Sequence, residues 1–88
     1  MKHFGITNRD SDGNNVIVGI IQNIPKSHAG IQSFNERLRD AVGDHLDIDE
    51  FNIDVVSIED IFGYKPKEVS IEVDGMNYFV EVEEVFFY

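Results

Sequence analysis

The sequence predicts an α+β fold in which an antiparallel sheet of about five strands, in the order β-β-α-β-β-β, carries one amphipathic helix packed on one face. Three observations predict it: strand-like runs at both ends of the chain, one helical repeat between them, and a hairpin signal at Asp74-Gly75. Because 88 residues supply one modest core, we expect a single domain over residues 1–88.

The first two strands are predicted at Lys2–Thr7 and Val16–Ile24. In the first, Phe4 and Ile6 fall on one face, and the second is apolar and β-branched. The segment Asn8–Asn15 between them is dense in turn-forming residues, which predicts a loop. We therefore expect the two strands to pair as a hairpin.

A helix is predicted next. Ser27 is placed to cap a helix that ends near Leu46. Two observations leave a start one turn later open, because Gly30 lies in the first turn and Ser33 has capping-box spacing to Glu36. The apolar residues at helical spacing, which should face the sheet, are Ile31, Phe34, Leu38, Ala41, Val42 and Leu46.

A third strand is predicted within Phe51–Phe62. Apolar residues alternate with polar ones from Phe51 to Val55, and the alternation then slips at Val55-Val56. The slip predicts a bulge or bend in this strand. The segment Gly63–Pro66 is the next turn.

The last two strands form the hairpin around Asp74-Gly75. Centring the turn there pairs Val73 with Met76, and the alternation then separates an apolar face from a polar one. The further pairs on the apolar face are Ile71 with Tyr78 and Val69 with Val80. The pairs on the polar face are Glu72 with Asn77, Ser70 with Phe79, and Glu68 with Glu81, and Glu83 follows on that face.

The net charge of −10 is unevenly distributed. Residues 1–39 carry five basic and three acidic side chains, a net of +2, whereas residues 40–88 carry fourteen acidic side chains and only Lys65 and Lys67, a net of −12. Such a charge repels nucleic acids and anionic membranes and attracts basic surfaces. We therefore expect a basic protein partner, no direct binding to nucleic acid, and no membrane binding.

The polar face of the C-terminal hairpin is the most informative feature of the sequence. Like charges directly opposed in a ladder destabilise a sheet, so Glu68 across from Glu81 is unfavourable for folding alone. Outward carboxylates two residues apart, such as Glu81 and Glu83, are about 6.7 Å apart. Neighbouring phosphates on one nucleic-acid strand are roughly 7 Å apart along the backbone. The array could thus imitate a phosphate backbone; an ordinary solvated face is the alternative.

A second acidic cluster extends from the helix end into the third strand, and it opens with Asp40. Acidic residues near a helix C-terminus oppose the helix dipole, which again works against local stability. A solubilising loop is the alternative interpretation. Together the two clusters give the candidate partner-binding residues Asp44, Asp47, Asp49, Glu50, Asp54, Glu68, Glu72, Glu81 and Glu83.

Nothing in the sequence predicts catalysis. It has no cysteine, no nucleophile motif and no phosphate-binding glycine loop, and its three histidines have no metal-ligand spacing. The run Asn8-x-Asp10-x-Asp12-Gly13 resembles the start of a calcium loop, but Gly19 stands where that loop needs a glutamate. We expect a protein that is not an enzyme and needs no cofactor or metal.

The aromatic C-terminus and the polar face of the hairpin suggest self-association. Phe79 and Phe87 are both expected to point away from the core, where an apolar patch is best covered by a second copy. We therefore expect a homodimer that uses Phe79 and Phe87. The alternative is that loops of the same chain cover both residues.

The sequence also bears on location. The N-terminus lacks the apolar run of a signal peptide, and the longest apolar stretch, Val16–Ile21, is too short to span a bilayer. Because the chain also lacks cysteine, we expect it in the cytoplasm.

In charge and layout, the acidic positions within 40–60 and the outward Glu68, Glu72, Glu81 and Glu83 resemble the small acidic proteins that phages make during host takeover. Many of these are cysteine-free DNA mimics. The resemblance implies an inhibitor of a DNA-binding protein, for example the histone-like nucleoid protein HU, and a place in the host cytoplasm if a phage encodes the protein. Two alternatives stay open: a structural or assembly module that self-associates through its C-terminus, and an anti-CRISPR, anti-restriction or antitoxin-like neutraliser of a basic enzyme.

Overall fold

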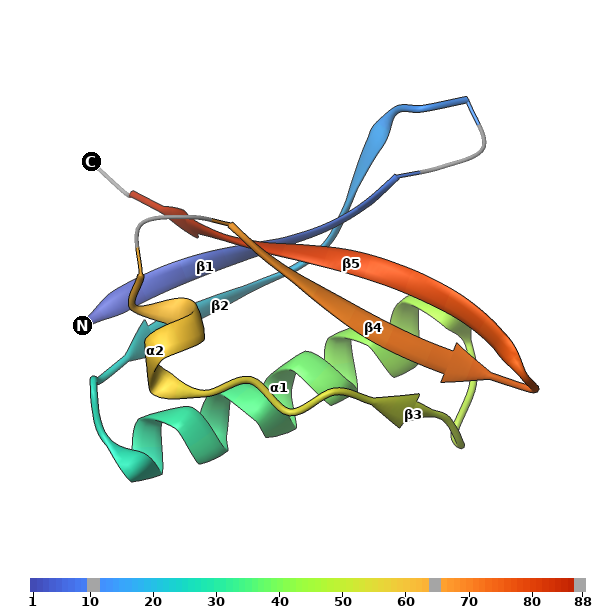
Figure 1. The fold of residues 1–88 in the computed structure, drawn as a ribbon. Helices are drawn as coiled ribbons and strands as arrows, with labels where there is room; N and C mark the ends of the chain where they lie inside the picture. The colour runs from blue at the N-terminus through green and yellow to red at the C-terminus, as the bar shows by residue number, and fades with distance from the viewer. Residues whose placement is uncertain (10–11, 64–65, 87–88) are drawn as a thin grey trace.

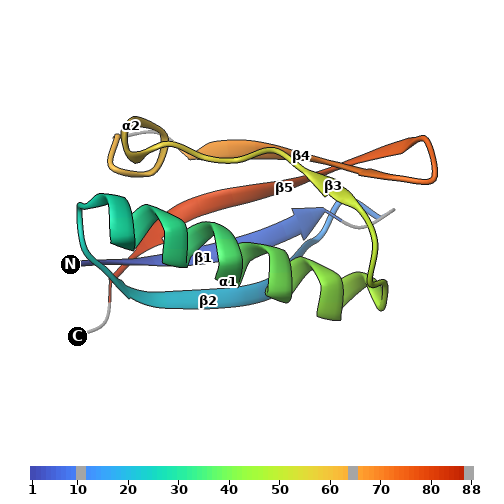
Figure 2. The same ribbon diagram turned by 90° about the horizontal axis from the view of Figure 1, so that it is seen from below.

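A computed structural model describes residues 1–9, 12–63 and 66–86, apart from the side chain of Ile58. Five antiparallel strands form one sheet in the order β2-β1-β5-β4-β3, and the main helix lies across one face (Figures 1 and 2). The predicted α+β fold is therefore confirmed. The elements are β1 (Lys2–Arg9), β2 (Asn15–Ile24), α1 (His28–Leu46), β3 (Asn52–Ile53), α2 (Ile58–Ile61), β4 (Lys67–Val73) and β5 (Met76–Val85).

The core lies between α1 and the sheet. Phe34, Leu38 and Val42 of α1 are buried, as their helical spacing predicts. Phe34 meets Phe4 of β1 edge to face, with the ring centroids 5.2 Å apart. The sheet contributes inward side chains from four strands, which are Phe4, Ile6, Ile21, Ile24, Val69, Ile71, Val80 and Val82.

The start of α1 settles the two alternatives for its N-terminus. Ser27 is the N-cap, and its hydroxyl oxygen accepts a hydrogen bond from the backbone N–H of Gly30 at 3.0 Å. The later start at Ser33 is therefore wrong. The helix ends at Leu46, and its C-cap, Asp47, adopts a left-handed conformation. Asparagine and aspartate accept this conformation more readily than most other residues.

The third strand is much shorter than the sequence predicts. Only Asn52 and Ile53 pair with β4, and the chain then leaves the sheet and forms the one-turn helix α2. Ser57 and Asp60 explain the change: the N–H of Asp60 donates to Ser57 Oγ (3.2 Å), and the N–H of Ser57 donates to Asp60 Oδ2 (2.9 Å). This reciprocal pair is a capping box, and it starts a helix where the alternation suggested a strand.

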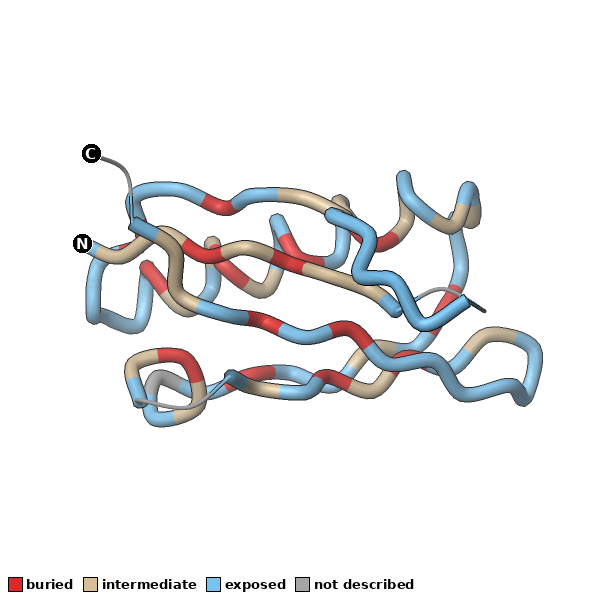
Figure 3. Tube along the Cα trace, turned by 90° about the horizontal axis from the view of Figure 1, so that it is seen from above, coloured by how far each residue is buried: buried red, intermediate tan, exposed pale blue. Residues whose placement is uncertain are grey.

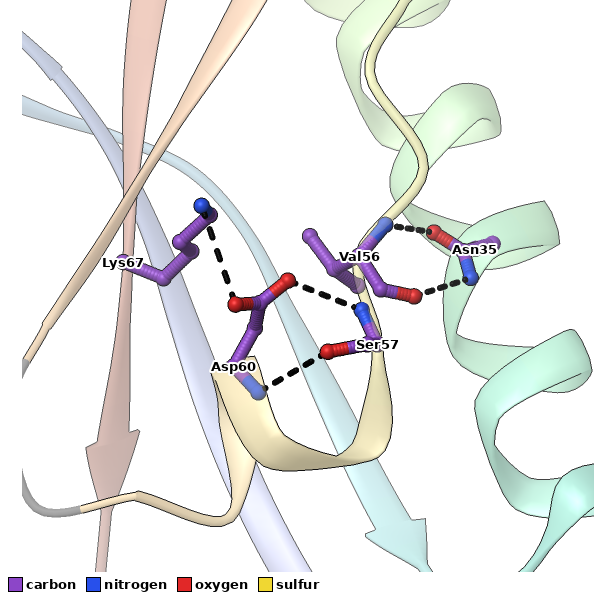
Figure 4. Close-up of polar contacts among 5 residues, drawn as sticks. All are labelled: Asn35, Val56, Ser57, Asp60 and Lys67. Atoms are coloured by element: carbon purple, nitrogen blue, oxygen red, sulfur yellow. Dashed lines mark hydrogen bonds and ion pairs between the residues drawn. The ribbon is translucent and has the colours of Figure 1, made fainter.

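Asn35 of α1 holds the segment between β3 and α2. Its side-chain oxygen accepts from the N–H of Val56 (3.0 Å), and its Nδ2 donates to the carbonyl of the same residue (3.1 Å; Figure 4). Both backbone groups of buried Val56 are thus satisfied without a neighbouring strand. The predicted bulge at Val55-Val56 is therefore a departure from the sheet.

The β4–β5 hairpin has the predicted register throughout, from Val73 opposite Met76 to Glu68 opposite Glu81. Coverage of its apolar face is incomplete, because Met76 and Tyr78 are 60% and 38% exposed. The reason is visible in Figure 1, where the hairpin tip extends beyond the end of β3. The β1–β2 hairpin is also confirmed, with two irregular steps in its register.

Candidate protein-binding surface

Glu68, Glu81 and Glu83 share the face of the sheet that points away from α1, which we call the outer face, and Glu72 lies on the same face nearer the hairpin tip. Glu68 of β4 lies directly opposite Glu81 of β5, and Glu81 lies opposite Thr7 of β1. Glu83 follows on the same face, opposite Gly5. All four glutamates are exposed, in strands where exposed and buried positions alternate (Figure 3).

Lys2 and Lys67 form ion pairs with other carboxylates. Lys2 pairs with Glu84 at 2.9 Å, and Lys67 approaches Asp60 at 3.8 Å. These are the ion pairs of the described residues, and neither includes a carboxylate of the outer face. Within the described residues, Glu68, Glu81 and Glu83 therefore form no ion pair.

A shallow hollow of about 270 Å³ lies beside the opposed glutamates. Glu68 and Glu81 line it together with Phe79, which is half exposed, as the sequence predicts. A carboxylate pair beside an aromatic ring suits a basic side chain, because carboxylates bind its charged head and the ring attracts the cation. Arg9 also lines the hollow and adds a positive charge at its rim.

The second group of predicted residues lies at the end of the molecule where α1 stops. Asp44, Asp47 and Asp49 line an open hollow of about 420 Å³. Arg39 also lines it, but its Nη2 donates to the carbonyl of Phe51 (3.0 Å), and its guanidinium lies 4.5 Å from the centroid of the Phe51 ring. Arg39 is thus held against the protein, within an acidic surface.

Glu72 connects the sheet to this acidic end. It lies opposite Asn52 in the β3–β4 ladder, and Asn52 Nδ2 donates to Glu72 Oε1 at 3.4 Å. Glu72, Glu50 and Asp74 line a further hollow of about 440 Å³. Asp74 was not predicted as a site residue, because the sequence assigned it only to the turn.

The nine predicted binding residues therefore do not form one surface. Glu68, Glu72, Glu81 and Glu83 lie on the outer face, and Glu72 also borders the acidic end. Asp44, Asp47, Asp49 and Glu50 lie at the acidic end. Asp54 belongs to neither group: its N–H donates to the carbonyl of Ser70 at 3.1 Å, beyond the last paired residue of β3. Phe87, predicted for self-association, lies outside the described residues.

The arrangement offers charge without a built chemical centre. Within the part of the chain that the structure describes, no group of three or more His, Cys, Asp or Glu side chains is placed to hold a metal ion. The pKa of Asp60 is lowered, chiefly because the backbone N–H of Ser57 donates to its carboxylate, with further help from the Ser57 side chain and Lys67. Asp60 thus serves the α2 cap.

Comparisons with known proteins found no relative of this chain. No protein-family model matches the sequence, and no curated protein or solved structure is similar to it. None of the helices in the described segments is long and apolar enough to cross a membrane. The surface must therefore be interpreted from its own geometry and charge.

Proposed function

We propose that this protein is an acidic DNA mimic that binds the DNA-binding surface of a basic protein and blocks DNA binding. The observation that carries the proposal is the exposed pair Glu68 and Glu81, opposed in one ladder and paired with no described cation. Opposed like charges work against folding. A basic partner would turn this unfavourable arrangement into a favourable one.

The geometry of the outer face supports the same proposal. The strands hold Glu81 and Glu83 at a fixed spacing of about 6.7 Å, and Glu68 adds a second row beside them. Such a regular array can meet several basic side chains of a DNA-binding surface at once. The adjoining hollow beside Phe79 adds one position where an arginine could both stack and form ion pairs.

We propose a histone-like nucleoid protein of the HU type as the target, in the host cytoplasm. Its basic surface binds the DNA backbone, which is the structure that the carboxylates would replace. A neutraliser of a basic enzyme, such as a restriction enzyme, a CRISPR effector or a toxin, would use the same surface. The identity of the captured partner separates these cases.

A competition experiment tests the target. Purified HU is bound to a fluorescent DNA duplex, and the protein is added while anisotropy is followed. We expect displacement of the DNA at low salt and a steep loss of inhibition as salt rises, because ions screen the attraction. If HU keeps its DNA, capture from a bacterial lysate at low salt decides the broader proposal. Recovery of no basic nucleic-acid-binding protein would contradict it.

A matched pair of variants tests the surface. The triple variant Glu68→Gln, Glu81→Gln, Glu83→Gln removes three charges from the outer face. The control Asp44→Asn, Asp47→Asn, Asp49→Asn removes three charges from the acidic end. We expect the first to weaken inhibition at least tenfold, about 1.4 kcal/mol, and the control to change it much less. A larger loss of inhibition in the control than in the outer-face variant would show that the partner binds at the end of α1 instead.

A further inference from the structure

The strand β2 forms an open edge of the sheet, at the side away from the acidic residues of β4. It spans Asn15–Ile24, and among the described strands β1 alone pairs with it. No residue in it is charged, and none is proline. Proteins normally protect edge strands with charged side chains, proline, bulges or a covering element. Of these devices, β2 itself supplies only its bulges.

One of these bulges shapes the apolar surface of the edge. Ile17 lies opposite Thr7, and Ile20 lies opposite Gly5. On β2 two residues lie between the paired positions, whereas on β1 only one does, so β2 carries one extra residue here. The bulge at Val18 therefore brings both isoleucines to the outer face. They are 70% and 52% exposed. Two large β-branched side chains thus stand beside an open edge.

The backbone of this edge is available for pairing. The carbonyl of Gln22 points away from β1, because Arg37 Nη1 reaches it from α1 at 2.9 Å. Backbone groups alternate along an antiparallel strand, so Ile20, two residues earlier, also directs its N–H and C=O outward. Arg37 covers β2 near Gln22, so the part of the β2 edge that is free to pair with another strand is Asn15–Ile20.

The distribution of the acidic residues favours a second copy of this chain as the partner that binds the β2 edge. The sheet order places β2 and β4 on opposite sides of the central strands, and the excess of acid lies after residue 40. Two copies joined at β2 would keep Glu68 and Glu81 of one copy apart from those of the other, because β1 and β2 of each copy lie between them. A two-fold contact through Phe79 would instead bring Glu68 and Glu81 towards the same glutamates of the second copy, because Phe79 lines one hollow with both of them.

We propose that two copies pair antiparallel through the edge of β2 and form one continuous ten-stranded sheet. A two-fold axis between Val18 and Gly19 sets Ile17 of each copy opposite the second copy's Ile20. Both positions lie on the same face, so four isoleucines meet across the junction. This inference does not rest on the proposed function, and it assigns the dimer to a different surface from Phe79 and Phe87.

Sedimentation velocity over a wide range of protein concentrations tests the pairing. We expect a concentration-dependent dimer, and Ile20→Lys should raise its dissociation constant at least tenfold by placing a charge at the junction. The matched control is Val55→Lys, since Val55 is 79% exposed on the segment after β3. Added salt should preserve or strengthen the dimer, whereas it should weaken binding to a basic partner. The two proposals can therefore fail independently.

Hydrogen exchange gives a second measurement that needs no variant. The amide of Ile20 should exchange fast in dilute protein and slowly at concentrations where the dimer forms, while the amide of Ile21, directed towards β1, stays protected in both. A monomer at all concentrations would overturn the proposal. So would a dimer that survives Ile20→Lys but dissociates when Phe79→Ser is introduced.

Discussion

Glu68 and Glu81 face each other across the β4–β5 ladder, both exposed, and no ion pair with a described lysine or arginine offsets their charges. Side chains at directly opposed positions have Cβ atoms about 5 Å apart, close enough for the two carboxylates to repel. This position is therefore a local conflict between charge and stability. Its size can be measured, and the measurement does not depend on any partner.

A double-mutant cycle with Glu68→Gln and Glu81→Gln should reveal this repulsion. Glutamine keeps the shape of the side chain and removes the charge. We expect either single change to stabilise the protein by about 0.2–1 kcal/mol, and the second to add little once the first is made. Urea denaturation of the four proteins gives the coupling energy.

The repulsion should also depend on salt. At high ionic strength the coupling energy should shrink, because the carboxylates are exposed and ions screen them. A matched change, Asp49→Asn, removes one charge from the acidic end and reports the effect of net charge alone. Equal stabilisation by Asp49→Asn and Glu68→Gln would show that the opposed pair has no special repulsion.

Asn35→Ala should destabilise the protein substantially. The change removes both hydrogen bonds to Val56 and leaves the N–H and C=O of a residue that is 1% exposed without their partner. A buried backbone group without a partner costs about 1–3 kcal/mol. We expect a loss of about 2 kcal/mol in the free energy of unfolding, measured by urea denaturation.

The control for this change is Gln32→Ala, one turn earlier on the exposed side of α1. It should alter stability by less than about 0.5 kcal/mol, as surface substitutions usually do. Asn35→Asp is a further probe, because it keeps the acceptor for the Val56 N–H but replaces the donor with an oxygen that faces the carbonyls of Val56 and Ile31. It should destabilise the protein at least as much as Asn35→Ala, and a stability close to that of the wild type would contradict this assignment of the contact.

Asp60 should make stability depend on acid pH. The Ser57 N–H that donates to its carboxylate is the main reason that its pKa lies below the ordinary 3.8. A carboxyl with a lowered folded pKa stabilises the fold fully above the unfolded pKa, and this contribution is lost as pH falls through the folded pKa. The difference in stability between wild type and Asp60→Asn should therefore be constant near neutrality and shrink below about pH 4.

Thermal unfolding of both proteins between neutral pH and pH 2 measures this difference. Ser57→Ala retains the backbone N–H that causes most of the shift, so it should keep most of the pH dependence while it weakens the α2 cap. A difference between wild type and Asp60→Asn that does not change with pH would show that Asp60 gains nothing from ionisation in the folded state.

Local signals in the sequence were sufficient to predict much of the fold. The Asp74-Gly75 turn sets the register of the whole β4–β5 hairpin, because a two-residue turn fixes which residues face each other. The spacing of Phe34, Leu38 and Val42 likewise predicts the buried side of α1. In both cases the residues that determine the structure are close together in the chain.

Long-range contacts account for what the sequence could not predict. Val56 leaves the sheet because Asn35, far away in the chain, takes over its hydrogen bonds. The division of the acidic residues into an outer face and an acidic end depends on the strand order, which periodicity does not determine. The Ser57–Asp60 capping box has the Ser-x-x-Asp spacing in the sequence, but the prediction of a strand from the alternation of Phe51–Val55 did not use it.

Gly30→Ala should destabilise the protein, although alanine is the better helix former. In an exposed helix interior the exchange would add about 1 kcal/mol of stability. Here Gly30 is buried, and a Cβ atom on it would lie 2.0 Å from the carbonyl oxygen of Pro25. The backbone fixes the position of a Cβ atom, and the oxygen belongs to the main chain, so no side-chain rotation can relieve this contact.

Relief would require the chain to shift at Pro25–Ser27. That shift would disturb the Ser27 cap, whose oxygen accepts from Gly30 N–H at 3.0 Å, and the bond from Ser27 N–H to the carbonyl of Pro25 at 2.9 Å. Overpacking and a lost cap each cost about 1–2 kcal/mol, which exceeds the gain in helix propensity. We therefore expect a net loss of about 1–2 kcal/mol and a fall in Tm of several degrees.

Calorimetry on Gly30→Ala, with Gln32→Ala as the matched change in the same helix, decides the sign. The control removes no buried contact, since Gln32 is exposed, and should leave Tm nearly unchanged. An unchanged or higher Tm for Gly30→Ala would mean that the turn into α1 can move without loss. The glycine would then be only a weak position in the first turn, as the sequence alone suggests, and not the residue that allows Pro25 to approach the helix.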